Sequence, residues 1–239
     1  MYDYFVLGYN GIDYFKQWYD FDHFVNTNLY IIDNGRQKVD TDLQKYITYT
    51  TTKNIGCSGG WNLICDIGFN YYGLEKIIVG QEDARVSEEI FEALIDGCNS
   101  SVIYGTYNNS FEFSTYAIHR ETFNSVGRFD ENFMFAGCED NDYKHRCKLK
   151  GVGIKTLGIS HFYNVSIANN AQTVPEKSPT HNANYVLEKW GDYKYELPFN
   201  GIERPKYTDY FKEIHGDIDM WPSEIEFNIF KSITDKKWI

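Results

Sequence analysis

The sequence predicts an α/β protein in which a parallel sheet carries helices on both faces. Short apolar runs at residues 4–9, 29–32 and 76–79 are typical of buried strands, and apolar residues recur at helical spacing between them. Alternation of strands and helices indicates a parallel sheet, because parallel neighbours need a crossover connection. The 239 residues are 42% hydrophobic, which is enough for a sizeable core.

The first hundred residues hold these signals in alternating order. We expect strands at residues 4–9, 29–32, 46–52 and 76–79, and helices that begin near residues 12, 63 and 87. The second strand ends at the turn Asp33-Asn34-Gly35, and the loop at 54–62 contains three glycines. Ser87 can cap the helix that follows the fourth strand.

The pattern changes after residue 100. We expect strands at 101–106, 112–119, 154–157 and 159–163, and helices at 121–126, 139–150 and 181–190. These pieces predict a mixed, antiparallel region (101–194) fused to the parallel half (1–100) in one domain, 1–194, without a linker. Residues 195–239 contain three prolines and one amphipathic helix. We expect this extension to pack back on the domain, and a contact with a partner is the alternative.

The bulk properties exclude several classes of protein. A net charge of −11 argues against nucleic acid or an anionic membrane as the main partner. The chain has no apolar run of membrane-spanning length, and its first residues lack the basic start of a secretory signal. Five cysteines without metal-type spacing favour reduced thiols and a cytoplasmic setting. The 20 tyrosines can stack on sugars, or they simply fill core and surface.

One acidic stretch stands out. Glu139, Asp140 and Asp142 place three carboxylates in four positions shortly after Gly137. Apolar residues one turn apart and a later glycine predict a short helix, whose first turn stabilises ionised carboxylates through the helix dipole. A charged turn that only stabilises this helix is the alternative interpretation. A second acidic site upstream favours a functional one.

That upstream site is Gln81-Glu82-Asp83, directly after an apolar strand. A carboxylate at a strand end can hold a hard divalent cation, whose other positions bind water and phosphate oxygens. A protein of negative net charge can bind a diphosphate in this way. Ligands of parallel sheets bind beyond the carboxyl ends of the strands, which places Asp33, the loop 54–62 and Asp83 along one edge. Considered alone, such an acidic turn is more often a solvated loop.

In this order the stretches resemble the GT-A fold glycosyltransferases, most closely the inverting family 2 enzymes, over about residues 4–191. The matching stretches are 9–10, 31–35, 54–62, 81–83, 129–133 with 139–142, 159–161 and 189–191. Each match is weak singly, but their shared order and spacing make the resemblance specific. It implies a GT-A, Rossmann-like mixed sheet, with a nucleotide-binding half at 1–100 and an acceptor half at 101–194.

The resemblance also implies roles for individual residues. Those implied to bind the nucleotide sugar are Tyr9, Asn10, Asp33, Asn54, Gly56, Gly60, Asn62 and Glu82. Asp83 and His161 are implied as ligands of Mn2+ or Mg2+, and a His ligand favours Mn2+ because imidazole suits transition metals. Asp140 is implied as the catalytic base, with Glu139 holding a hydroxyl of the acceptor.

Other interpretations stay open at several of these positions. Gln81 stands where the family has the first Asp of its metal motif, which leaves Asp83 as the candidate ligand. The pair Gly59-Gly60 can serve close packing at a helix start. His161 lies in an apolar run, where a buried and hydrogen-bonded histidine is the common alternative to a ligand.

These observations predict a glycosyltransferase that moves a sugar from a nucleoside-diphosphate sugar, with UDP as the first choice, to a hydroxyl of a glycan acceptor. Inversion needs a carboxylate that takes the acceptor proton, here Asp140, and no protein nucleophile. Asp142 lies on another face of the helix and is expected to be structural. The rivals are an inactive nucleotide-sugar or carbohydrate-binding module, which Gln81 favours, and a nucleotidyltransferase.

Overall fold

The computed structural model describes residues 1–9, 24–35, 47–51, 54–82, 84–106, 113–157, 162–163 and 178–191. Three of the predicted site residues, Asn10, Asp83 and His161, lie outside these ranges. The helix expected near residue 12 and the extension 195–239 also lie outside them. The division of the chain into 1–194 and 195–239 therefore stays a prediction.

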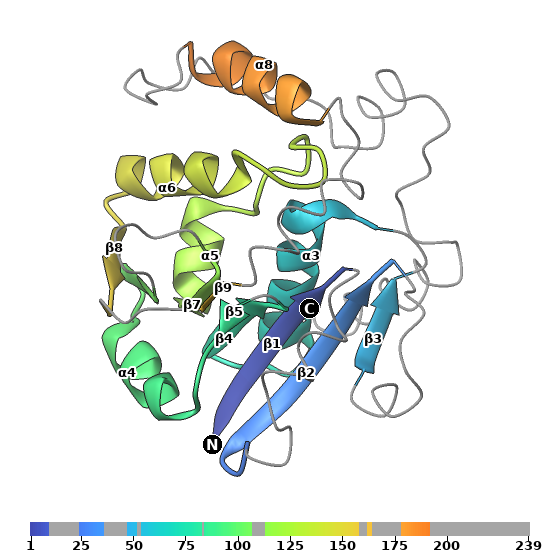
Figure 1. Ribbon diagram of the computed structural model, residues 1–239. Coiled ribbons are helices and arrows are strands. Elements are labelled where there is room, and N and C mark those ends of the chain that lie inside the picture. Colours follow the sequence, from blue (N-terminus) through green and yellow to red (C-terminus); the bar gives the residue numbers. More distant parts are fainter. Residues whose placement is uncertain are drawn as a thin grey trace.

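A seven-stranded sheet forms the centre of the molecule, in the order β3-β2-β1-β4-β7-β6-β8 (Figure 1). Its strands are β1 (Tyr2–Gly8), β2 (Thr27–Asn34), β3 (Ile47–Thr51), β4 (Lys76–Gln81), β6 (Val102–Gly105), β7 (Thr115–His119) and β8 (Gly153–Thr156). Only β7 is antiparallel to its neighbours among these strands, and the other pairs are parallel. The short strands β5 (Ala84–Arg85) and β9 (Phe162–Tyr163) form a separate antiparallel pair.

Helices cover both faces of this sheet, as the strand–helix alternation predicts. They are α3 (Gly56–Cys65), the π-helical turn η2 (Asp66–Tyr71), α4 (Glu89–Gly97), α5 (Arg120–Val126), α6 (Glu139–Leu149) and α8 (Ser178–Trp190). Successive residues of a strand point to opposite faces. Accordingly Phe5 and Leu7 of β1 join a core cluster with residues of α3, α5 and α6, whereas Tyr4 and Val6 join a cluster with residues of α4.

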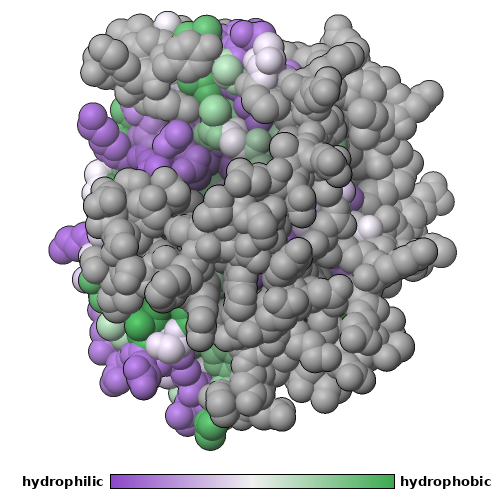
Figure 2. All heavy atoms as spheres, viewed as in Figure 1, coloured by the Kyte–Doolittle hydropathy of each residue, from purple (hydrophilic) through white to green (hydrophobic). Residues whose placement is uncertain are grey.

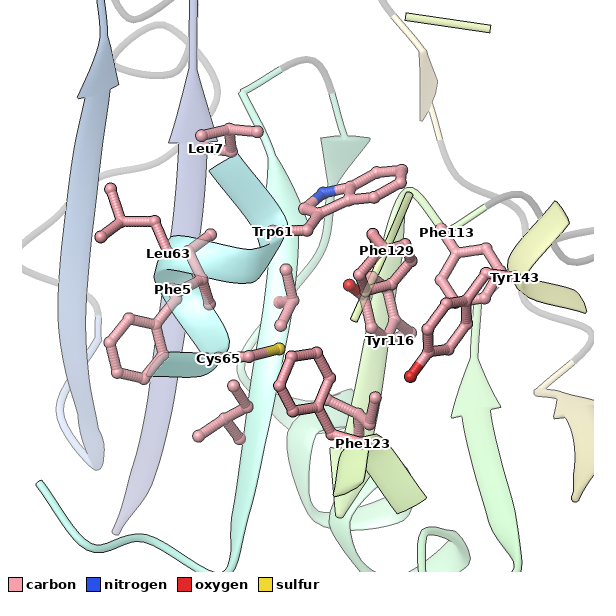
Figure 3. Packing of buried hydrophobic residues seen from close by; sticks show 14 of the residues in the cluster. Phe5, Leu7, Trp61, Leu63, Cys65, Phe113, Tyr116, Phe123, Phe129 and Tyr143 are labelled. Carbon is pink, nitrogen blue, oxygen red and sulfur yellow. The ribbon is translucent and has the colours of Figure 1, made fainter. Parts of the chain in front are cut away.

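The larger cluster ties the helices to the sheet through aromatic side chains. Figure 3 shows Trp61 of α3 reaching from the neighbourhood of Leu7 toward Phe113 and Phe129. The Trp61 and Phe129 ring centroids lie 4.9 Å apart, and Phe129 stacks on Tyr143 of α6 at 3.9 Å. Burying rings of this size is the main stabilising contribution in this layer.

The structure corrects the sequence prediction in two places. The helix expected over 63–69 begins at Gly56, so most of the glycine-containing loop is helical. A Cβ atom at Gly60 would lie 2.5 Å from Cδ1 of Leu7, so close packing of α3 on β1 outweighs the low helix propensity of glycine. In the second half, β6 and β8 pair in parallel and join the main sheet, while β7 and the short β9 supply the expected antiparallel pairing.

The position of hydrophilic side chains on the surface and the state of the cysteine thiols agree with a globular domain. In Figure 2, hydrophilic residues gather over the part of the molecule that Figure 1 assigns to α6, whose sequence is mostly charged. All five cysteines are free thiols. None of the helices in the described part of the chain is both long enough and apolar enough to cross a lipid bilayer.

Candidate functional site

The carboxyl ends of β1, β2 and β4 meet at one edge of the sheet. In the strand pairing Gly8 faces Asp33 and Leu7 faces Gln81, and the N–H of Glu82 donates to the Leu7 carbonyl at 3.2 Å. The side chains of Asp33 and Glu82 are buried there, although both belong to types that usually face water. The predicted donor contacts Asp33 and Glu82 therefore follow strands that end together.

Tyr9 and Asn54 lie at the same edge. A Cβ atom at Gly35 would lie 3.1 Å from the Tyr9 ring and 3.2 Å from the Asn54 nitrogen, so this glycine permits three chain segments to approach closely. Gly35 has φ = +124°, a conformation that suits glycine. We call Tyr9, Asp33, Asn34 and Asn54 the strand-end rim.

Asn34 organises this rim, although no motif in the sequence indicates a role for its side chain. Its Nδ2 donates to Oδ1 of Asn54 at 3.0 Å, and its Oδ1 accepts from the Ile55 N–H at 2.9 Å. Oδ1 of Asn54 also accepts from the Gly56 N–H at 2.8 Å. These bonds fix the loop before α3 without any ligand. The one signal in the sequence was the Asp-Asn-Gly turn, because Asn side chains commonly bond to nearby backbone.

The start of α3 contacts the chain just before α6. The Cys57 N–H donates to the Phe135 carbonyl at 2.6 Å. Gly56 has φ = +74°, and a Cβ atom there would lie 3.2 Å from the same carbonyl oxygen. This contact joins the loop after β3 to residues 133–138, which we call the α6 turn. It is the point at which the predicted donor side and the predicted acceptor side meet.

The α6 turn has an unusual backbone. Phe135, Gly137 and Cys138 have φ values of +52°, +106° and +74°. The left-handed conformation costs a non-glycine residue about 1–2 kcal/mol, so Phe135 and Cys138 need external contacts to hold it. Asn182 of α8 supplies several of these contacts through hydrogen bonds to the backbone of Met134, Ala136 and Gly137.

The segment before this turn is fixed by α3 and η2. Oδ1 of Asn62 accepts from the Phe129 N–H at 2.8 Å, and its Nδ2 donates to the Phe129 carbonyl at 2.9 Å and to Glu131 at 2.7 Å. Arg128 pairs with the buried Asp66 at 2.8 Å. Asn62, implied by the resemblance to contact the nucleotide sugar, thus uses its side chain here to hold residues 129–131.

A buried ionic network attaches α8 to α6. Lys189 pairs with Asp130 and, at 2.7 Å, with Asp142. Asp142 is fully buried and also accepts from Arg146 at 2.8 Å and from the indole N–H of Trp190 at 2.9 Å. Burial opposes ionisation of Asp130, but the Lys189 charge together with the hydrogen bonds from Lys189, Asn132 and Tyr185 outweighs it and lowers the pKa of that carboxyl. Asp142 therefore has the structural role that its position on the helix predicts.

Glu139 and Asp140 begin α6 and differ in their surroundings. Burial raises the pKa of Glu139 to about 8, and the nearby Asp140 charge adds to the rise. Its Oε2 is buried and has no hydrogen-bond partner among the residues that the structure describes. The Asp140 side chain is 19% exposed and lies 3.3 Å from the Lys144 ammonium. Adjacent carboxyl groups in such different environments suit different roles in proton transfer.

The predicted metal ligands, Asp83 and His161, cannot be placed, because both lie outside the described ranges. Within those ranges no group of three or more His, Cys, Asp or Glu side chains could hold a metal ion. Their neighbours in sequence do come together. Ala84 pairs with Tyr163 and Arg85 with Phe162 in the β5–β9 ladder, so the segments that follow the two predicted ligands lie side by side.

Comparison with known proteins supports the fold. No protein-family profile and no curated protein sequence matches this chain. Among solved structures, it is similar to a crystal structure of GalNAc-T7 with UDP, GalNAc and Mn2+. The TM-score is 0.50 at 11% sequence identity, over 98% of this chain and 55% of that one. The chain thus spans about half the length of this glycosyltransferase, and the likeness confirms the predicted GT-A fold.

Proposed function

We propose that this protein is a glycosyltransferase that moves a sugar from a nucleoside-diphosphate sugar to a hydroxyl of a glycan acceptor, with inversion and with a divalent metal. One observation carries the proposal. The Phe135 carbonyl accepts from the Cys57 N–H at the start of α3, and this contact supports a single site between the loop after β3 and the acidic start of α6. The GT-A fold supports a nucleotide at the strand ends, where ligands of such sheets bind.

On the donor side, the strand-end rim holds the nucleotide. Asp33 is a buried carboxyl group at the end of β2 and would accept hydrogen bonds from the ribose or uracil. Tyr9 and Asn54 lie beside Gly35 at the same strand ends, and the Gly56 carbonyl accepts from Asn34. In α3, Gly60 packs on Leu7 of β1 and Asn62 holds residues 129–131, and both are proposed to line the donor site. Asn10 and Glu82 complete the proposed donor contacts. UDP is the first nucleotide to test, since the structural neighbour was crystallised with it.

On the metal side, Asp83 and His161 would hold Mn2+ or Mg2+. A bound divalent cation supplies positive charge to the leaving diphosphate. The pairing of β5 with β9 supports this assignment, because it brings together the segments that directly follow the two residues. Glu82 precedes Asp83 and follows a strand that pairs with β1, which keeps this turn beside the rim.

On the acceptor side, Asp140 takes the proton of the attacking hydroxyl while the oxygen bonds to the anomeric carbon. The bond from that carbon to the diphosphate oxygen breaks at the same time, and configuration inverts. The Asp140 side chain is partly exposed at the start of α6 and lies beside Lys144, so it can reach an acceptor. Glu139 holds a neighbouring hydroxyl, and its protonated form would donate a hydrogen bond to it.

The direct test is transfer by the Asp140→Asn variant. Wild-type protein is incubated with a panel of UDP-sugars and Mn2+, with water or glycans as acceptor, and UDP release is measured. Asp140→Asn should reduce transfer by about 10²–10⁴-fold, the usual size of a lost acid–base group. Donor affinity should stay unchanged. Asp96→Asn, on the exposed side of α4, is the matched control and should transfer normally.

Two further readouts separate the parts of the proposal. Product configuration, read by NMR, should be opposite to that of the donor, and retention would overturn Asp140 as the base of an inverting reaction. Excess chelator should abolish transfer and added Mn2+ restore it, and full activity without metal would remove Asp83 and His161 from the site.

The rival functions have their own signatures. A binding module, which Gln81 in the metal motif favours, would bind UDP-sugars without releasing UDP. A nucleotidyltransferase would release pyrophosphate instead. Either result would replace the proposed reaction while leaving the rim as the nucleotide site.

A further inference from the structure

The α6 turn has a strained backbone immediately before Glu139 and Asp140, the two carboxyl groups of the proposed acceptor side. Three of its six residues, Phe135, Gly137 and Cys138, have positive φ. Cys138 is the N-cap residue of α6, and its side chain makes no capping hydrogen bond. The conformation of this turn therefore sets the direction in which Glu139 and Asp140 leave the chain. Strained backbone of this kind persists only where surrounding groups hold it.

Asn182 is the side chain that holds it from α8. Its Oδ1 accepts from the Met134 N–H at 2.7 Å. Its Nδ2 donates to the carbonyls of Met134, Ala136 and Gly137 at 3.0, 3.1 and 2.9 Å. Asn182 is 1% exposed, so water does not substitute for these bonds. Only a primary amide presents an acceptor and two donor hydrogens from one short side chain, which makes the residue type specific to this task.

Other contacts besides those of Asn182 attach α8. Seven and eight residues further along the helix, Lys189 and Trp190 bond to Asp142, and Lys189 also pairs with Asp130. Close to the other end, His181 contacts the carbonyl of Asn132 at 3.1 Å. Removing the Asn182 amide should thus leave α8 in place and release mainly the backbone of 134–137.

We infer that Asn182 is a positioning residue, which fixes the α6 turn and thereby aims Asp140 and Glu139 at the acceptor. The catalytic consequence of this inference rests on the proposed function. The hydrogen bonds from Asn182 to the α6 turn, which we call the Asn182 clamp, do not depend on it. A displacement of about 1 Å in a catalytic group can cost about 100-fold in rate. Loss of the clamp should therefore lower the rate of the chemical step, while the strand-end rim still binds nucleotide.

The test compares Asn182→Ala and Asn182→Asp with Asn184→Ala, an exposed asparagine two residues along the same helix. Amide hydrogen exchange is measured over residues 133–142, and kcat and the donor KM are measured well below the unfolding temperature. Both Asn182 variants should exchange faster in this segment and lose about 10–100-fold in kcat with unchanged donor KM. Asn182→Asp keeps the acceptor oxygen but turns a carboxylate toward three carbonyls, so it should do no better than alanine. Asn184→Ala should match the wild type in both measurements.

Each outcome decides a separate point. Unchanged exchange over 133–142 in both Asn182 variants would overturn the clamp, whatever reaction the protein catalyses. Faster exchange with normal kcat would overturn the positioning role and leave a purely structural one. If the wild-type protein transfers no sugar while the exchange result holds, the proposed function fails and the clamp stands. Should Asn182→Ala fold poorly, Asn182→Gln, which keeps the amide one methylene further out, should recover part of the protection.

Discussion

The strand-end rim and the α6 turn are joined through the start of α3, where the Cys57 N–H donates to the Phe135 carbonyl, yet they differ in what holds them. Asp33 and Asn34 of the rim lie in a parallel strand whose backbone pairing fixes them, such as Gly8 against Asp33, and the Asn34 side chain then fixes Asn54. Residues 129–138 have no such ladder, because Asn62 of α3 holds residues 129–131 and Asn182 of α8 holds the α6 turn. One wall of the proposed site thus depends mainly on backbone pairing, and the other depends on a few side chains.

The two regions should also differ in how much stability a substitution costs. A strand shares its stability among many backbone bonds, so losing one side chain costs little. The chain from 128 to 142 depends on buried polar groups, and removing one partner leaves another buried and unpaired. We therefore expect the largest losses of stability on the α6 side and the cleanest losses of ligand affinity at the rim.

The largest effect should come from Lys189→Met. The substitution leaves the buried carboxylates of Asp130 and Asp142 without this cation, and breaking such a pair costs about 3–5 kcal/mol of unfolding free energy. Urea denaturation measures it directly. Lys148→Met, at an exposed position of α6, is the matched control and should change stability by less than about 0.5 kcal/mol. A loss of similar size in both variants would show that the network is not what holds α8.

The effect of Glu139 on stability should be smaller for each unit of pH. Because the pKa of Glu139 is raised in the folded protein to about 8, the folded state keeps a proton that the unfolded chain releases above pH 4.5. Stability linked to this group is thus complete below pH 4.5 and decreases as the pH rises toward 8, by up to about 1.4 kcal/mol per pH unit. Glu139→Gln should remove this part of the slope.

Unfolding free energy is measured as a function of pH for the wild type and for Glu139→Gln. Both pH profiles are needed because burial also raises the pKa of Asp66 and of Glu131. Both groups remain in the variant, so only the difference between the profiles reports Glu139. Parallel profiles between pH 5 and 8 would mean that Glu139 ionises normally in the folded protein.

The smallest effect should be that of Asp33→Asn on UDP affinity. Loss of one charged hydrogen bond to the ribose or uracil, about 1.4 kcal/mol, corresponds to about tenfold weaker binding, measured by calorimetry. The unfolding temperature should change little, because the β1–β2 ladder does not need this side chain. Asp3 lies near the start of β1, at the opposite end of the strand from the rim, and accepts a hydrogen bond from Asn28. Asp3→Asn is therefore the control and should leave UDP affinity intact. Equal affinities in all three proteins would remove Asp33 from the site.

The same difference explains what the sequence could and could not predict. Apolar runs and turn residues predicted the strands and the acidic start of α6, because these signals are local. The start of α3 was missed, since Gly60 stays helical only by packing on Leu7. Asn62 lies 67 residues from Phe129, and Asn182 lies 48 from Met134. No local sequence pattern indicates such distant partners, so the hydrogen bonds of Asn62 and Asn182 could be identified only from the structure.

The bonds from Asn62 and Asn182 have a consequence for how this protein can change. Almost all of them end on backbone atoms, of Phe129, Met134, Ala136 and Gly137. Backbone atoms are the same for every residue type, so the half-buried side chain of Ala136 can be exchanged while the turn keeps its course. Evolution and directed libraries can therefore vary the side chain at this turn without changing the backbone course that leads into Glu139 and Asp140.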